Sequence, residues 1–143
     1  MAKNKEEKTN VMRVLEQKKI AYTAHTYPHE EGMAVDGVTV AQSMGFDPAI
    51  VFKTLVARGA SKQYYVFDVP VAENLDLKKA AKAVGEKSIE MIHQKELLPL
   101  TGYVHGGCSP VGMKKLFPTV FHETAENLAA MIVSAGKIGY QVE

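Results

Sequence analysis

One lysine of this sequence stands inside an apolar segment, where an ammonium group is unexpected. Lys53 is the charged residue of IVFKTLV, residues 50–56, whose β-branched and aromatic residues predict a buried strand. Because side chains alternate between the two faces of a strand, Lys53 should share a face with Val51 and Leu55. The pattern alone favours a lysine whose stem packs while its ammonium reaches water. The alternative is an ammonium at the floor of a cleft that binds a carboxyl, phosphate or ester oxygen.

A second candidate for chemistry is the glycine-rich segment TGYVHGGCSPVG, residues 101–112. Paired glycines, here Gly106 and Gly107, allow another molecule to approach the backbone closely. Ser109 followed by Pro110 has the pattern of a helix N-cap with proline at the first helical position. A helix that begins there would place free backbone N–H groups beside the glycines, where they could stabilise an oxyanion. The alternative interpretation is a glycine-rich turn followed by a capped helix.

No side chain is an evident nucleophile. Cys108 lies in the glycine-rich segment, but the sequence pairs no histidine with it, and a lone cysteine is more often a small buried hydrophobe. Ser109 is better explained as a helix cap. The five histidines show no metal-binding spacing, so we expect neither a metal nor a cofactor. The sequence therefore offers a site that could stabilise an electrophile, without a protein nucleophile.

Short helices and short strands must position these residues. We predict helices at residues 9–18 with Thr9 or Asn10 as the cap, 38–44, 76–85 with Asp76 as the cap and Gly85 at the end, 93–98 ending before Pro99, and 124–128. We predict strands at residues 21–27, 50–57, 63–69, 88–91, 103–105, 119–122 and 131–134. Strands do not alternate regularly with long helices, which favours a single α+β domain with a mixed, mostly antiparallel sheet.

Composition sets the class of protein. The chain has 143 residues, 46% of them hydrophobic, and a formal net charge of +1. We expect a flexible N-terminus at residues 1–8 and one globular domain at residues 9–143. A protein that binds nucleic acid by charge alone is normally more basic, so an RNA contact would be small or supported by a partner. One cysteine excludes an internal disulfide and a cysteine-based zinc site, and the absence of a signal-like or membrane-spanning apolar run favours the cytoplasm.

Several of these segments together resemble the YbaK family. The matching blocks are HTY at 25–27, FKTL at 52–55, LDLKKAAK at 75–82, TGY at 101–103, GGxSPxG at 106–112 and SxGKxG at 134–139. They occur in the order of the family and span about residues 19–143, which is more specific than any block alone. The resemblance implies a curved, barrel-like sheet flanked by short helices. Family members usually continue beyond the position of Glu143, and Cys108 stands where the family often has an aliphatic residue.

The resemblance also implies an activity and a set of site residues. The family removes cysteine misattached to proline tRNA, with tRNA(Cys) as a further carrier, so the implied function is that of a trans-editing aminoacyl-tRNA deacylase. Lys53 matches the essential strand lysine, and Gly106 matches a glycine of the catalytic site. The substrate-binding residues that the resemblance implies are Tyr27, Thr54, Gly107, Ser109 and Ser134.

The implied mechanism is substrate-assisted. The thiol of the misattached cysteine attacks its own carbonyl and gives a cyclic thiolactone and free tRNA, so the protein needs no nucleophile. Lys53 would hold the 3′-terminal ribose, the phosphate or the ester, the backbone of Gly106 and Gly107 would contact the carbonyl, and Tyr27 would shape the pocket. Prolyl-tRNA synthetase is the implied partner, which would account for the near-neutral charge.

Two other functions stay open. One is a non-catalytic module of the same fold that binds tRNA or prolyl-tRNA synthetase. The other is a deacylase for a different small amino acid, because a methylene or hydroxyl group changes the binding free energy by only about 1–3 kcal/mol.

Overall fold

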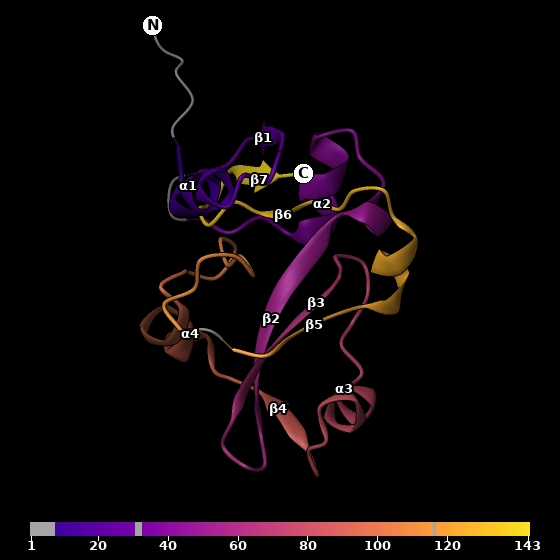
Figure 1. Ribbon diagram of the computed structural model, residues 1–143. Coiled ribbons are helices and arrows are strands. Elements are labelled where there is room, and N and C mark those ends of the chain that lie inside the picture. Colours follow the sequence, from indigo (N-terminus) through magenta and orange to yellow (C-terminus); the bar gives the residue numbers. More distant parts are fainter. Residues whose placement is uncertain (1–7, 31–32, 116) are drawn as a thin grey trace, which may run out of the picture.

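The two longest strands form a hairpin at the centre of the structure (Figure 1). The computed structural model describes residues 8–30, 33–115 and 117–143. Strand β2 (Phe52–Gly59) pairs antiparallel with β3 (Tyr64–Pro70) and, along its other edge, with β4 (Ile89–Met91). Strand β5 (Thr119–Phe121) lies parallel to β3, which completes a sheet of order β4-β2-β3-β5. The sheet is thus mixed and mostly antiparallel, as the sequence predicts.

A second sheet joins segments that are far apart in the chain. Its order is β1-β7-β6, with antiparallel pairing of β1 (Ala24–Thr26), β7 (Tyr140–Val142) and β6 (Val133–Ser134). A parallel bridge between Val51 and Ile132 connects this sheet to the start of β2. The two sheets do not close into a barrel, because strands of two or three residues form too few ladder hydrogen bonds to complete the ring. The predicted α+β class is confirmed, and the sheet that the resemblance implies to be barrel-like is not closed.

Helices lie at the ends of the sheets (Figure 1). The helices are α1 (Asn10–Gln17), α2 (Gly37–Ser43), α3 (Leu77–Val84) and α4 (Gln94–Thr101), and two 3₁₀ turns span Pro48–Ile50 and Glu123–Asn127. The predicted caps of α1 and α3 are confirmed, since Thr9 accepts a hydrogen bond from the Met12 N–H and Asp76 accepts from two N–H groups of the first turn. The predicted flexible segment at residues 1–8 falls, apart from its last residue, outside the described residues.

Helix α4 continues past the proline that was expected to end it. Pro99 lies inside Gln94–Thr101, and the helix ends three residues later at Gly102, which has a φ of 87°. Proline removes one N–H, but the last turn is held by other bonds. Gly102 N–H donates to the Leu98 carbonyl at 2.8 Å, and the Thr101 hydroxyl donates to the Leu97 carbonyl at 2.8 Å. The prediction that this helix stops before residue 99 is therefore wrong.

The segment after α4 is irregular. Residues 103–105 form no strand, and no helix begins at Ser109 and Pro110, so both predictions are wrong. The Ser109 hydroxyl oxygen accepts from the Val111 N–H at 3.2 Å, which closes a local turn where a helix cap was expected. The Tyr103 hydroxyl donates to the Val111 carbonyl at 2.5 Å and fixes the same turn. Side-chain hydrogen bonds of this kind compete with helix formation.

The main core lies between β2 and the β1-β7-β6 sheet. Its buried residues include Val11 and Leu15 of α1, Phe52 and Val56 of β2, and Val142 of β7. A smaller cluster packs α3 against the outer part of the β4-β2-β3-β5 sheet. Each helix in the described ranges is too short or too polar to cross a membrane.

Candidate active site

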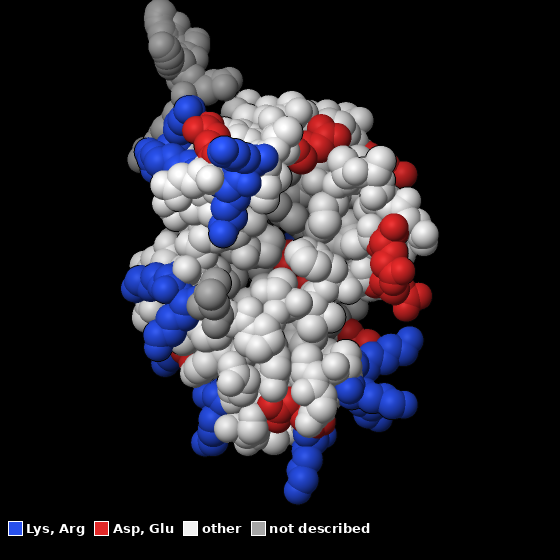
Figure 2. All heavy atoms as spheres, in the orientation of Figure 1, with Lys and Arg blue, Asp and Glu red and all other residues white. Residues whose placement is uncertain are grey.

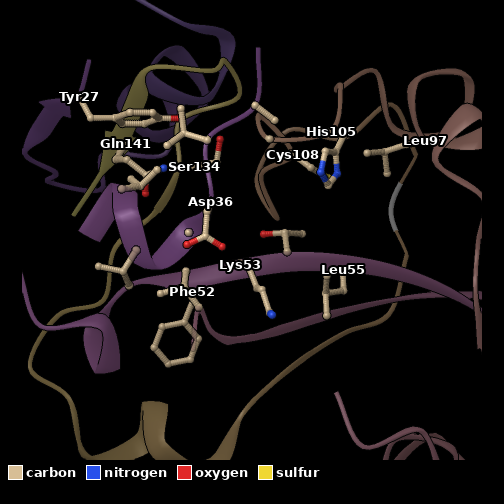
Figure 3. A pocket seen from close by; sticks show the side chains of 18 residues that line it. Tyr27, Asp36, Phe52, Lys53, Leu55, Leu97, His105, Cys108, Ser134 and Gln141 are labelled. Atoms are coloured by element: carbon tan, nitrogen blue, oxygen red, sulfur yellow. The ribbon is translucent and has the colours of Figure 1, made fainter. Parts of the chain in front are cut away.

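A cavity of about 410 Å³ opens where β2 meets the second sheet (Figure 3). Its walls come from Tyr27, the loop at residues 34–37, residues 51–55 at the start of β2, the loop at residues 105–108, and Ser134 and Gln141 of β6 and β7. Figure 2 shows that the middle of one face is hollowed and largely uncharged, with most Lys and Arg near its edges. The volume is that of a small-molecule site.

Lys53 contributes a cation to this cavity. It is partly buried, pairs with Val69 across the hairpin, and projects from the same side of β2 as Leu55 (Figure 3). The predicted sharing of a face with Leu55 is confirmed. Among the described residues, its ammonium forms no hydrogen bond and no ion pair. An unpaired ammonium at a cavity wall is available to an anionic or carbonyl ligand.

Thr54 lines the cavity from the opposite face of the strand, and a buried carboxyl group lies behind it. The Thr54 hydroxyl donates to Asp68 Oδ1 at 2.6 Å, and the two residues are paired in the β2–β3 register. Asp68 has 0% exposure, and burial raises its pKa from 3.8 to about 7. Its Oδ2 has no hydrogen-bond partner within the described part of the chain. The sequence interpretation missed Asp68, although an aspartate inside the apolar strand YYVFDVP is a recognisable signal.

Gly106 borders the cavity, whereas Gly107 is not one of its lining residues. Gly106 has a φ of 90°, and a Cβ at this position would lie 2.7 Å from the Ala34 Cβ. A Cβ at Gly107 would lie 3.0 Å from the Ile138 nitrogen. The space that these glycines leave open is therefore occupied by other residues of the same chain, Ala34 beside Gly106 and Ile138 beside Gly107. The Gly107 N–H already donates to the Val104 carbonyl at 2.9 Å, while the Gly106 N–H has no partner among residues 8–30, 33–115 and 117–143.

Cys108 borders the cavity but is a poor nucleophile. It is 8% exposed, and burial together with the neighbouring Asp68 charge raises the pKa of its thiol to about 12. The reactive form of cysteine is the thiolate, which is scarce at neutral pH for such a group. Ser109 is fully buried in its turn and does not border the cavity. Neither residue has the geometry of an activated nucleophile.

Three buried residues complete the wall opposite β2 (Figure 3). Burial raises the pKa of the Tyr27 hydroxyl, and the Tyr27 N–H donates to the Gly139 carbonyl at 3.0 Å. The Ser134 hydroxyl oxygen accepts from the Gly136 N–H at 3.1 Å. Gln141 is buried, and its Oε1 has no partner among the described residues. No sequence signal pointed to Gln141, because the short strand β7 was not predicted.

The structure thus brings most of the implied site residues to one cavity. Lys53, Thr54, Gly106, Tyr27 and Ser134 all line it, whereas Gly107 and Ser109 lie outside its lining. Within the described ranges, no group of three or more His, Cys, Asp or Glu side chains is arranged to hold a metal ion. The cavity therefore presents the ammonium of Lys53, the carboxylate of Asp36, the imidazole of His105 and the hydroxyl groups of Tyr27, Thr54 and Ser134.

Comparison with known proteins gives relatives that share most of this chain. A protein of Enterococcus faecalis, named "Putative Cys-tRNA(Pro)/Cys-tRNA(Cys) deacylase EbsC", is 47% identical over 100% of this chain and 87% of its own length. The crystal structure of "a putative trans-editing enzyme for prolyl tRNA synthetase" superposes with a TM-score of 0.77 at 25% identity, over 92% of this chain and 82% of that one. Hypothetical protein APE2540 superposes with a TM-score of 0.81 at 16% identity, over 92% and 85% of the two chains, which supports the fold alone.

The family model described as "Aminoacyl-tRNA editing domain" matches residues 29–143, which include every cavity wall except Tyr27. Together with the relative that is 47% identical along the whole chain, this match shows that the chain belongs to the aminoacyl-tRNA editing domain family, the YbaK family.

Proposed function

We propose that this protein is a trans-editing deacylase that removes cysteine misattached to tRNA(Pro), with tRNA(Cys) as a second carrier. The observation that carries the proposal is an unpaired ammonium, Lys53, in a cavity whose one thiol, Cys108, is buried and protonated. Such a site can orient a substrate and stabilise negative charge but cannot itself attack a carbonyl. A cysteinyl ester supplies the missing nucleophile.

The chemistry is a transfer within the substrate. The cysteine sulfur forms a bond to its own carbonyl carbon, the bond from that carbon to the ribose oxygen breaks, and the thiol proton passes to the ribose oxygen. The products are a thiolactone and tRNA with a free terminal hydroxyl. No water is consumed in this step, so we assign the reaction to the lyase type, with later opening of the thiolactone by water outside the site.

The roles that we propose for the site residues are supported by their positions in the cavity. Lys53 holds the terminal phosphate, ribose or ester oxygen, and the free Gly106 N–H donates to the carbonyl oxygen as negative charge develops there. One well-placed donor of this kind contributes on the order of 3 kcal/mol to the transition state. Tyr27, Thr54 and Ser134 shape the chamber for the aminoacyl group. The cavity thus acts mainly by proximity and by charge stabilisation.

Prolyl-tRNA synthetase is the proposed partner. A chain with a net charge of +1 has little electrostatic attraction for tRNA. A synthetase that holds the body of the tRNA would leave only the acceptor end to be bound here. Tight and salt-sensitive binding of tRNA by the isolated protein would contradict this part of the proposal.

The test is a deacylation panel with Cys-, Ala-, Ser- and Pro-charged tRNA(Pro), and with Cys-tRNA(Cys), followed by mass spectrometry of the released product. Cysteine release as thiolactone, abolished by Lys53→Ala and retained by Lys79→Ala, is the expected result. Lys79 is a matched control because it is an exposed lysine on α3 that does not line the cavity.

Other outcomes of the panel separate the alternatives. Absence of turnover with every charged tRNA, at stoichiometric protein, would favour a non-catalytic binding module. Release of alanine or serine faster than cysteine would identify another small amino acid as the substrate. It would also exclude the thiol-assisted mechanism. Full activity of Lys53→Ala would refute the role given to Lys53.

A further inference from the structure

One buried carboxyl group beside the cavity has no part in the proposed reaction. Asp68 is completely buried on β3, directly opposite Thr54 in the register of the hairpin. The ion pairs among the described residues do not include Asp68, and its Oδ2 lacks a hydrogen-bond partner there. A buried carboxyl group without a cation or a full set of hydrogen bonds destabilises the fold. Because Asp68 lies beside the cavity, a bound ligand can compensate this cost.

The hydrogen bond between Thr54 and Asp68 determines whether Thr54 acts as a hydrogen-bond donor or acceptor in the cavity wall. A threonine hydroxyl has one hydrogen to donate and two lone pairs to accept with. When Asp68 is ionised, that hydrogen is directed to Asp68 Oδ1 at 2.6 Å, so the Thr54 oxygen is left to accept a hydrogen bond from the cavity. Hydrogen bonds to a charged acceptor are short and strong, which keeps this orientation in place. The wall at Thr54 therefore selects a hydrogen-bond donor.

Charge favours one donor of the substrate over the other. The aminoacyl end of tRNA carries two donors near its ester: the α-amino group of the amino acid and the free hydroxyl of the terminal ribose. Only the α-amino group can be a cation, and a cation bound at Thr54 would lie close to the Asp68 carboxylate, which forms no ion pair with a described side chain. A neutral hydroxyl would leave that charge uncompensated.

We propose that Thr54, oriented by Asp68, binds the α-amino group of the aminoacyl ester, so that the cavity distinguishes a free amino acid ester from one without an amino group. The ligand class rests on the proposed function. Thr54 is the contacting residue, and Asp68 is a positioning residue that acts through it. Thr54 thus recognises the α-amino group, which all amino acids share.

Binding of stable analogues tests this without relying on turnover. The probes are adenosine derivatives in which cysteine is joined to the ribose 3′ position by an amide, the matching 3-mercaptopropionyl derivative that lacks the amino group, and the 2′-deoxy form of the first. Isothermal titration with the full chain measures the affinity for each. We expect the wild-type protein to prefer the amino-bearing analogue by about 10- to 100-fold, the range for a hydrogen bond to a charged group.

Variants of Thr54 and Asp68 distinguish a hydrogen bond between Thr54 and the ligand from packing of the Thr54 side chain. Thr54→Val removes the acceptor at nearly constant volume and should abolish the preference, whereas Thr54→Ser keeps the hydroxyl and should restore it. Asp68→Asn should weaken the preference, and Thr54→Val with Asp68→Asn should be no weaker than Thr54→Val alone, because Asp68 acts through Thr54. Circular dichroism and urea unfolding verify that each variant is folded.

Three results would overturn the inference. One is equal wild-type affinity for the analogues with and without the amino group. Another is an unchanged preference in Thr54→Val. The last is loss of the Thr54-dependent affinity in the 2′-deoxy analogue, which would assign the acceptor to the ribose hydroxyl. Failure of the proposed function gives a different result, namely no turnover of Cys-tRNA while the binding preference and its loss in Thr54→Val remain.

Discussion

Replacing Asp68 by asparagine should make the stability of the protein less sensitive to pH. Burial raises the pKa of this carboxyl from 3.8 to about 7, because the charged form is separated from water. The hydrogen bond from Thr54 lowers the pKa and offsets only part of this effect. The folded protein then holds the Asp68 proton more tightly than the unfolded chain does. Asp68 consequently stabilises the fold at low pH, and this contribution is lost as the pH rises from about 4 to about 7.

The size of the effect follows from the two pKa values. A tenfold change in an equilibrium is about 1.4 kcal/mol, so raising the pKa from 3.8 to about 7 corresponds to roughly 4 kcal/mol over the whole range. Between pH 5 and pH 8 the unfolded chain is already ionised while the folded protein becomes so. That window contains about 2–3 kcal/mol of the total. Asparagine is never ionised. The free energy of unfolding of Asp68→Asn should therefore increase by this amount relative to that of the wild type as the pH rises from 5 to 8.

Urea unfolding followed by circular dichroism at pH 5, 6, 7 and 8 measures the difference. The free energy of unfolding of Asp68→Asn minus that of the wild type should rise steadily across the series, because the other titrating groups are common to both proteins. Glu73→Gln is the matched control, since Glu73 is exposed and forms no side-chain hydrogen bond to another described residue. A difference that stays constant with pH for Asp68→Asn would refute the assignment of a raised pKa to this carboxyl.

Other predictions concern the cavity wall and its loops. Lys53→Met should lower kcat/KM for Cys-tRNA(Pro) by about 10²- to 10³-fold, because the proposed charged contact to the substrate is lost; a loss under tenfold would contradict that role. Gly106→Ala should destabilise the protein by about 1–3 kcal/mol more than Gly45→Ala in urea unfolding. Both glycines have positive φ, but only at Gly106 would the new Cβ meet Ala34. Cys108 should react with iodoacetamide at pH 8 about 10³-fold more slowly than a free thiol, as measured by mass spectrometry, because burial raises its pKa to about 12. Rapid labelling of the folded protein would show that the thiol is accessible and ionised.

Local signals in the sequence predicted most elements that carry the cavity. The β2–β3 hairpin follows from two apolar runs separated by a polar turn, and α3 follows from Asp76 at its start and Gly85 at its end. These signals depend on residues close together in the chain, where backbone preferences act directly. Lys53 was found because one charged residue interrupts an apolar strand. Its place in a cavity needed the tertiary structure.

Non-local contacts account for what was missed. Strand β7 has three residues and exists because β1 and β6 pair with it from both sides, so its own sequence gives little signal. Gln141 was missed with it. The helix expected at Ser109 failed because the side chain closes a turn with Val111. Sequence pattern alone could not distinguish a capped helix from such a turn.

The central place of β7 in its sheet has a consequence for how the protein folds. The pairing of Ala24 with Val142 closes a loop that contains nearly the whole described chain. Contacts between such distant residues form slowly, because much chain entropy is lost before they contribute. The β2–β3 hairpin, which carries Lys53, can form early from local contacts, whereas the wall with Ser134 and Gln141 must wait for the two ends to meet. Binding competence should therefore appear as a late kinetic phase of refolding, after the hairpin and its helices have formed.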